Sequence, residues 1–343
     1  MKKLKKICCW ILISVLVQGV LLSYINFIYL PGRVNVRVTM YESESATVKN
    51  RSFKLPDEAR DVTVSYDGLY VAYRHGNDLS IADISKRKTV KTLNPPGGSF
   101  TCLRWLPDRD MLVYSIKEPE KKRGQVRIST YDIGSDLERS YPDITSLPEG
   151  SEIIDIELSP LTNIVYSMIK INKTKAKLYR FDIMDNLKFI MDTDISTVIK
   201  ETMYTDSLIY QLSDGRIRIR NGKTGKSGRI PVKEAKLLLH TDENDLIYTG
   251  ATDKNGRLTA IFFGKAGQQA EKWETLILEQ PLSATDAFIT AEGAVYVADR
   301  QSKRLQALKG TGVTEYQGGL LTVLNDYAVS MDRDKLLLKV LKK

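Results

Sequence analysis

The chain has 343 residues, of which 42% are hydrophobic and 27% are charged. This composition is ordinary for a globular protein with a sizeable core, and it excludes an intrinsically disordered chain. The formal net charge is +9, and four of the 51 basic residues are Lys2, Lys3, Lys5 and Lys6. The other basic residues are spread among 42 acidic ones, so the concentrated basic stripe of a nucleic-acid-binding protein is missing.

Cysteine usage excludes a disulfide framework. Cys8 and Cys9 stand at the start of an apolar run, and Cys102 is alone in the remainder of the chain. That remainder can therefore form no internal disulfide. Because Cys102 lies in the apolar stretch from Phe100 to Leu106, we expect it to pack as a small buried residue.

An apolar segment follows the first lysines. The 24 residues Ile7–Leu30 carry no charge, and at ~1.5 Å per residue a helix of this length crosses ~30 Å of hydrocarbon. The run is longer than the apolar region of a cleaved signal peptide and ends without a small-residue cleavage site. The lysines before it indicate a cytoplasmic N-terminus. The sequence thus predicts a cytoplasmic tail (1–6), an uncleaved transmembrane signal-anchor helix (7–30), a linker (31–43) and an extracytoplasmic domain (44–343).

The predicted domain repeats a short β-strand at intervals of roughly 35–50 residues, the range expected of propeller blades. Seven copies occur: Tyr70–Tyr73, Leu112–Ser115, Ile164–Ser167, Leu208–Gln211, Leu246–Thr249, Ala294–Val297 and Tyr327–Ser330. Each copy is followed by a loop and another alternating strand: Leu79–Ala82, Val126–Ser129, Lys177–Arg180, Arg216–Ile219, Leu258–Ile261, Arg304–Ala307 and Leu336–Lys339. Alternating residues between tight turns are the signature of β-hairpins, and no sustained helical period occurs after the apolar run.

The repeat predicts an all-β fold, a single β-propeller of seven four-stranded blades preceded by one transmembrane helix. Radial packing of such sheets buries their faces and leaves only short edges exposed. The last copy has too few residues after Tyr327 for a complete blade. We therefore expect Ser45–Leu55 to supply its outer strand and so close the ring. Six and eight blades are the alternative counts.

A known family shares the first repeat. The segment Ser65–Tyr73, SYDGLYVAY, resembles the S-x-D-G-x-x-[VIL]-A-[FY] repeat of TolB-type propellers, which also occurs in the propeller of dipeptidyl-peptidase-type proteins. Two later segments resemble it in part: Leu106–Tyr114 without the glycine, and Ser159–Tyr166 without the Asp-Gly pair. The resemblance implies a propeller fold over the domain. It implies no activity, because such propellers serve as scaffolds, adaptors and gates.

The residue types needed for catalysis are scarce. His75 is expected in a loop of the first blade and His240 in the first strand of the fifth, so we expect a turn residue and a packed side chain. There is no nucleophile elbow, hydrolase domain or zinc-binding cluster of His and Cys. The acidic stretches Asp192–Asp194 and Asp253–Gly256 lack the spaced ligands of a calcium loop. The sequence therefore predicts no catalytic, cofactor-binding or metal-binding residue.

Two further features concern packing and partners. The charged segment Lys117–Arg123 is expected to be the solvated tip of a hairpin. Trp105 and Trp273 are expected in the core or between blades.

The functional hypothesis is a non-catalytic, membrane-anchored extracytoplasmic propeller of a bacterial cell envelope. It would act as a protein-binding scaffold or accessory subunit, with a membrane and an extracytoplasmic protein as partners and no nucleic acid. The alternative is a carbohydrate- or small-ligand-binding sensor that holds its ligand in the central channel. An enzyme of the lyase or quinoprotein type is the least favoured class.

Overall fold

The protein is described by a computed structural model that covers residues 2–24, 48–95, 97–119 and 123–342. The chain divides into two units, Met1–Thr47 and Val48–Lys343. Within the first unit, α1 (Lys2–Tyr24) is helical. Among the residues whose side chains are described, no helix has the length and apolar character needed to cross a membrane. Residues 25–30 of the predicted span and the whole predicted linker lie outside the described residues.

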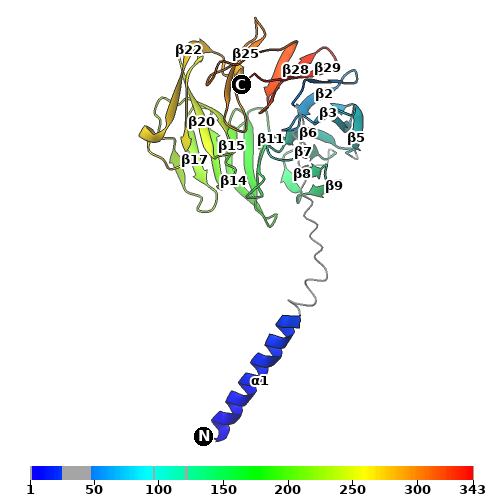
Figure 1. Cartoon of the computed structure of the whole chain (residues 1–343), viewed down its shortest axis with the longest axis vertical. Coiled ribbons are helices and arrows are strands. Elements are labelled where there is room, and N and C mark those ends of the chain that lie inside the picture. Colours follow the sequence, from blue (N-terminus) through cyan, green and yellow to red (C-terminus); the bar gives the residue numbers. More distant parts are fainter. Residues whose placement is uncertain (1, 25–47, 96, 120–122, 343) are drawn as a thin grey trace. The chain divides into compact units, whose positions relative to one another are not determined.

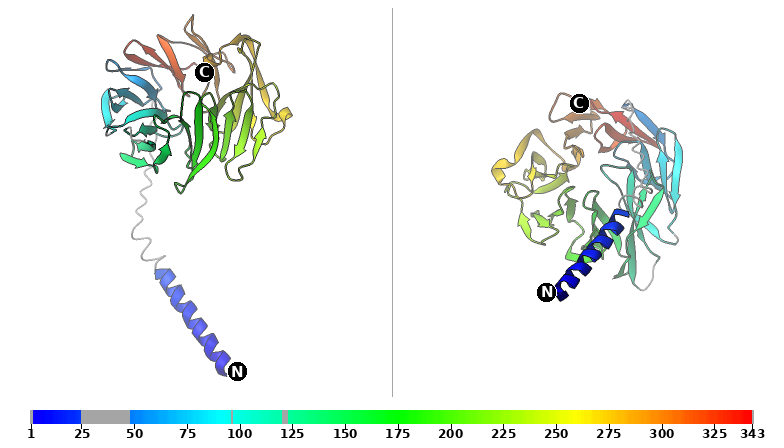
Figure 2. Two further views of the ribbon diagram at one scale, coloured as in Figure 1. Left: turned by 180° about the vertical axis from the view of Figure 1, so that it is seen from behind. Right: turned by 60° about the horizontal axis from the view of Figure 1, so that its bottom comes forward.

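The second unit consists of seven antiparallel sheets arranged in a ring (Figures 1 and 2). We number these blades in chain order, and in each blade the first strand is innermost. Blade 1 contains β2 (Arg60–Val64), β3 (Tyr70–His75), β4 (Asp78–Asp83) and β5 (Lys88–Leu93). Blade 2 contains β6 (Ser99–Trp105), β7 (Met111–Lys117), β8 (Gly124–Asp132), β9 (Leu137–Ser140) and β10 (Ile144–Leu147). Blade 3 contains β11 (Glu152–Ser159), β12 (Ile164–Lys170), β13 (Lys175–Phe181) and β14 (Leu187–Asp194).

The remaining blades follow the same order. Blade 4 contains β15 (Val198–Glu201), β16 (Ser207–Gln211), β17 (Ile217–Asn221) and β18 (Ser227–Arg229). Blade 5 contains β19 (Leu237–Thr241), β20 (Leu246–Thr252), β21 (Leu258–Lys265) and β22 (Glu274–Leu282), with the short helix η2 (Ala270–Lys272). After η3 (Ala284–Asp286), blade 6 contains β23 (Ala287–Ile289), β24 (Val295–Asp299), β25 (Arg304–Ala307) and β26 (Val313–Glu315). Blade 7 contains β27 (Gly319–Val323), β28 (Tyr327–Asp332), β29 (Lys335–Val340) and β1 (Arg51–Lys54).

The ring closes as the sequence predicts. β1 pairs antiparallel with β29, from Arg51 opposite Leu338 to Lys54 opposite Lys335. The N-terminal segment of the propeller thus becomes the outer strand of the last blade, and the blue start of the propeller near β2 lies beside its red end at β29 (Figure 1). The seven-blade count is confirmed, and the repeated segments form the second and third strands of the seven blades.

Blade 2 departs from the simple pattern. Its outer edge consists of two short strands, β9 and β10, which both pair with β8. Pro142 lies between them, and proline has no amide hydrogen to donate to the ladder. A single proline therefore divides what would be one outer strand.

The apolar core lies between neighbouring blades. One cluster joins Phe53 and Leu338 of blade 7 to Val71 of blade 1, and similar clusters occur at the other boundaries. Trp105 and Trp273 are both buried in such clusters, as predicted. Cys102 is partly buried against the cluster between blades 2 and 3, and burial raises the pKa of its thiol to about 11.

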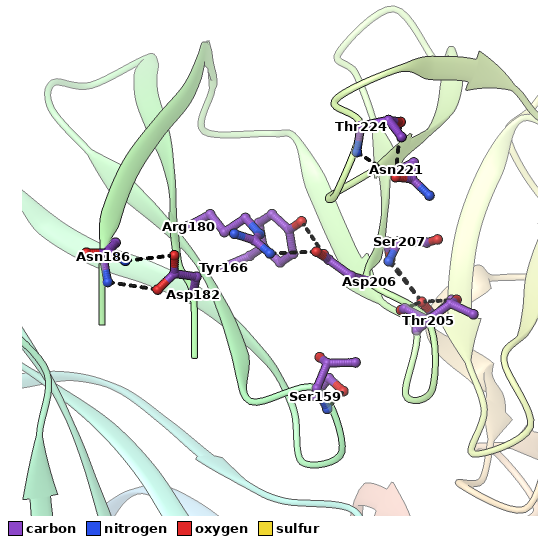
Figure 3. Close-up of polar contacts among 12 residues, drawn as sticks. Ser159, Tyr166, Arg180, Asp182, Asn186, Thr205, Asp206, Ser207, Asn221 and Thr224 are labelled. Atoms are coloured by element: carbon purple, nitrogen blue, oxygen red, sulfur yellow. Dashed lines mark hydrogen bonds and ion pairs between the residues drawn. The ribbon is translucent and has the colours of Figure 1, made fainter. Parts of the chain in front are cut away.

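A polar contact also joins blades 3 and 4 (Figure 3). Asp206 accepts a hydrogen bond from the Tyr166 hydroxyl at 2.9 Å and an ion-pair contact from Arg180 Nη2 at 2.5 Å. Asp206 is only 6% exposed, so its charge is stabilised by these partners rather than by water. Gly222 makes room for it, because a Cβ there would lie 1.9 Å from Asp206 Oδ1.

Candidate functional site: the mouth of the central channel

A cavity of about 550 Å³ lies where the innermost strands end and enter their turns. All seven blades contribute to its wall. We call this end of the ring the mouth face, and the turns between the first and second strands the rim loops. The cavity wall includes aromatic side chains (Tyr66, Trp105), aliphatic ones (Val62, Leu321, Leu324) and a set of charged groups.

Four ionisable side chains lie on the innermost strands of successive blades. Arg104, Glu157, Lys200 and His240 lie on β6, β11, β15 and β19, opposite Val113, Tyr166, Ile209 and Tyr248 respectively. Val113 and Ile209 are the second residues of their repeated segments, and Tyr166 and Tyr248 are the third residues of theirs. The innermost strands of a closed ring meet around its axis, and all four side chains line the cavity, so we call them the belt.

Glu157 is the centre of the belt. Its Oε1 lies 2.5 Å from Arg104 Nη1 and 2.6 Å from Lys200 Nζ. Burial disfavours its charge, but the two cations hold the pKa of Glu157 below its ordinary value. Arg104 Nη2 also lies 3.4 Å from Asp155 Oδ1. Burial and the negative charge of Glu157 raise the pKa of Asp155, although the positive charge of Arg104 opposes the rise. Two cations and two carboxyl groups thus lie together at the floor.

His240 continues the belt beside Lys200. Burial and the positive charges of Lys200 and Arg104 lower the pKa of His240 to about 4, so the imidazole is neutral at pH 7. Its expected place in the first strand of blade 5 is confirmed, but the side chain lines the cavity instead of packing in the core. His75 is the last residue of β3, at the opposite end of the ring, and is exposed. The two histidines are not brought together.

Hydrogen bonds join the rim loops of blades 3, 4 and 5. The Ser159 hydroxyl donates to the Met203 carbonyl at 2.6 Å. Asp245 accepts from the amides of Met203, Tyr204 and Thr205 at 2.6, 2.9 and 3.0 Å. The rim loop of blade 4 is therefore held from both sides.

Similar contacts join the other blades. The Glu243 amide donates to the Ala291 carbonyl at 2.8 Å, and the Glu292 amide to Asn325 Oδ1 at 3.2 Å. Arg51 Nη1 donates to the Gly68 carbonyl at 2.7 Å and links blade 7 to blade 1. Trp105 Nε1 donates to the Thr63 carbonyl at 3.2 Å and links blade 1 to blade 2. Together with the Arg104–Glu157 pair, these bonds join every neighbouring pair of blades near the mouth.

The acidic stretches that the sequence singled out lie elsewhere. Asp192 and Asp194 lie on β14, where they pair with Lys177 and Lys175 at 2.8 and 2.7 Å. Asp253 accepts backbone hydrogen bonds within the turn after β20. Across the part of the chain that the structure describes, no three His, Cys, Asp or Glu side chains converge to hold a metal ion. The charged hairpin tip lies between β7 and β8, and its residues 120–122 are outside the described residues.

Sequence reasoning missed the belt. If the seven repeats are aligned on their second strands, the belt residues fall at two different positions of the preceding strand. The only signal in the sequence is that four successive first strands each carry an ionisable residue near their end.

Comparison with known proteins supports the fold alone. No protein-family model and no curated protein matches the chain. The β-propeller domain of Myceliophteria thermophila Cps50 (Swd1) is similar at 12% identity and a TM-score of 0.53, over 85% of this chain and 100% of that one. Kluyveromyces lactis Hsv2 is similar at 10% identity and a TM-score of 0.52, over 83% of this chain and 98% of that one. The chain is a seven-bladed β-propeller.

A third similarity is looser. Porphyromonas gingivalis dipeptidyl peptidase 4 matches at 13% identity and a TM-score of 0.44, over 71% of this chain and 44% of that one. The TolB-type resemblance of the sequence has no matching family model, so it stays a prediction.

Proposed function

We propose that this propeller is a non-catalytic, protein-binding scaffold of the cell envelope. In this proposal the N-terminal helix holds it at a membrane, and the propeller lies on the extracytoplasmic side. The bound protein docks on the mouth face.

Exposed apolar side chains on the mouth face carry the proposal. Leu161 and Tyr204 lie on the rim loops of blades 3 and 4, and Ile183 and Met184 lie on the hairpin between β13 and β14, which turns at the same face. Tyr204 is 65% exposed and Met184 76%. Tyrosine and methionine are enriched at protein interfaces, and apolar groups gathered on one surface mark sites of interaction. The bonded rim loops keep this surface in one shape, which lowers the entropy cost of binding.

The helix supports the membrane part of the proposal. Trp10 to Tyr24 are exposed, and the apolar ones lie on every side of α1. A helix that is apolar all round needs an apolar environment. The charge-free run Ile7–Leu30 and the lysines before it fit a single membrane crossing with a cytoplasmic N-terminus.

Site-specific photocrosslinking in the native cells tests the protein-binding role. The photoreactive residue p-benzoylphenylalanine is placed at position 204, and in a matched chain at position 255, an exposed position in the turn between β20 and β21 on the opposite face. We expect one discrete protein adduct from position 204 and none from position 255. Equal labelling from both positions, or no adduct from position 204, would contradict docking at the mouth face.

Protease added to cells stripped of their wall tests the location. We expect the propeller to be digested while the membrane is intact. Protection of the propeller until the membrane is lysed would contradict the extracytoplasmic placement.

A small-ligand sensor is the second candidate, and the cavity favours it. Its volume of about 550 Å³ lies within the ~300–1,000 Å³ typical of small-molecule sites. The test is thermal unfolding of the full chain against a panel of neutral sugars and small metabolites. A ligand-specific rise in melting temperature that is lost in His240→Leu would favour the sensor.

A further inference from the structure

The rim loops carry an excess of negative charge. Together they contain nine carboxylates: Asp67, Asp108, Asp110, Asp206, Asp242, Glu243, Asp245, Glu292 and Asp326. Their one basic residue is Arg109, which pairs with its neighbour Asp108 at 2.6 Å. Asp206 is paired with Arg180. Among the described residues, no cation forms an ion pair with Asp67, Asp110, Asp242, Glu243, Asp245 or Glu292.

Carboxyl groups of neighbouring blades face one another at two places on the rim. Burial and the negative charge of Asp67 raise the pKa of Asp110 to about 7. Burial and the charges of Glu292 and Asp242 raise the pKa of Glu243. A site that disfavours its own carboxylates in this way attracts a positive charge, because a cation relieves the repulsion.

A buried carboxyl group lies inside the mouth. Glu201 is the last residue of β15, lines the cavity and is only 7% exposed. Neither of its carboxylate oxygens has a hydrogen-bond partner among the described residues. Burial, with the negative charges of Glu157 and Asp206, raises the pKa of Glu201 well above the ordinary value, although the positive charge of Arg180 opposes the rise. A buried carboxyl group without a partner is rare and calls for an explanation.

The cations near Glu201 already pair with other carboxylates. Arg180 Nη2 contacts Asp206 at 2.5 Å, while Arg180 Nε has no hydrogen-bond partner among the described residues. Lys200 and Arg104 share Glu157 at 2.6 and 2.5 Å. The floor of the cavity is therefore close to charge balance, and the unbalanced charge of the mouth is negative.

We propose that the channel mouth receives a lysine or arginine side chain of the bound protein and holds its cationic head beside Glu201 and the rim carboxylates. This inference rests on the proposed protein-binding function and names the chemistry of its partner. The stem of such a side chain would lie along the aliphatic wall at Leu321 and Leu324, as the stems of long basic side chains do. The exposed Tyr204 and Leu161 beside the mouth provide apolar contacts for the flanking polypeptide, which a free metal ion or small cation would not use.

The first test measures the site in isolation. The full chain in detergent micelles is titrated with Nα-acetyl-arginine amide, and in parallel with its uncharged analogue Nα-acetyl-citrulline amide. Calorimetry in two buffers of different ionisation enthalpy gives the Kd and the number of protons released. At low salt we expect the arginine probe to bind about tenfold more tightly, and to release a proton on binding because the cation favours the ionised form of Glu201.

Two variants separate the proposal from a structural role of Glu201. Glu201→Gln should abolish the proton release and weaken arginine binding about tenfold, without lowering the melting temperature. Glu279→Gln, which removes an exposed carboxylate from the outer strand β22, is the control and should change neither. Equal binding of the two probes, no binding of either, or proton release that persists in Glu201→Gln would overturn the proposal. A fall in melting temperature with an unchanged Kd would show that Glu201 pairs with Arg180, and would overturn it as well.

The second test keeps the inference separate from the proposed function. The double variant Glu243→Gln/Glu292→Gln is combined with the photoreactive residue at position 204. An adduct in the parent that is reduced at least fivefold in the double variant supports the inference. An adduct of undiminished yield overturns the inference and leaves the scaffold function standing. The absence of any adduct in the parent overturns both.

Discussion

Phe53→Ala is the sharpest test of how the ring is closed. Phe53 lies on the four-residue strand β1, is 8% exposed, and packs with Leu338 of blade 7 and Tyr73 of blade 1. Its ring centre lies 6.5 Å from that of Tyr73. Truncation of a buried phenylalanine to alanine costs about 3–5 kcal/mol. Because β1 is short and lies at an edge, we expect the lower end, about 3 kcal/mol. At about 2–4 °C per kcal/mol, the melting temperature should fall by roughly 6–12 °C.

The assay compares thermal and guanidinium unfolding of the full chain by circular dichroism and tryptophan fluorescence. Phe189→Ala is the matched control, because Phe189 lies on the outer strand β14, is 45% exposed, and contacts Tyr179. Loss of that exposed contact should cost about 1 kcal/mol. If Phe53→Ala costs no more than the control, β1 does not stabilise the ring and the closure argument fails.

Three further predictions concern polar groups. In a denaturant titration, Gly222→Ala should lower the free energy of unfolding by about 3 kcal/mol, because the new methyl group displaces Asp206 from its charged hydrogen bonds. Gly228→Ala is the control and should be neutral, because no heavy atom lies within 4 Å of its new Cβ. Glu157→Gln should cost about 3 kcal/mol near neutral pH, since it leaves two partly buried cations without their shared carboxylate. Because the pKa of Glu157 is lowered in the folded chain, this difference should shrink as the pH falls through that pKa, and a constant difference would contradict the prediction. The pKa of Glu201 is raised in the folded chain, so at a pH above the ordinary pKa of glutamate the folded chain keeps a proton that the unfolded chain has lost. The free energy of unfolding should therefore fall as the pH rises from the ordinary pKa to the raised one. The fall should be smaller in Glu201→Gln, and parallel pH profiles for the two proteins would refute the assignment.

Local signals in the sequence were strong enough to give the blades. Neighbouring residues alone produce the turn at Asp67 and Gly68 and the alternating strand that follows it. The turn needs a positive φ, which is 69° at Gly68, and glycine adopts such a φ without steric cost. The break in the outer strand of blade 2 has an equally local cause in Pro142, yet the repeat alone did not reveal it, because the repeat was aligned on the second and third strands.

The candidate site could not be read in the same way. His240 falls in an alternating strand like any other, and nothing adjacent to it in the sequence marks it as a cavity residue. Lys200, which precedes Glu201, pairs with Glu157, 43 residues earlier in the chain. Hydrophobic periodicity tells which residues face a neighbouring blade, but it does not tell which polar side chains of different blades meet.

By itself, then, the sequence determined the strands, the turns, the number of repeats and the strand that closes the ring, because these depend on steric preferences and alternation within a few residues. Only the tertiary structure decided that Arg104, Glu157, Lys200 and His240 form one belt and that Glu201 is buried without a partner at an acidic mouth. The physical reason is that closure of the ring brings the innermost strands of separate blades around one axis, where burial and Coulomb interactions between distant segments set the charge of their side chains.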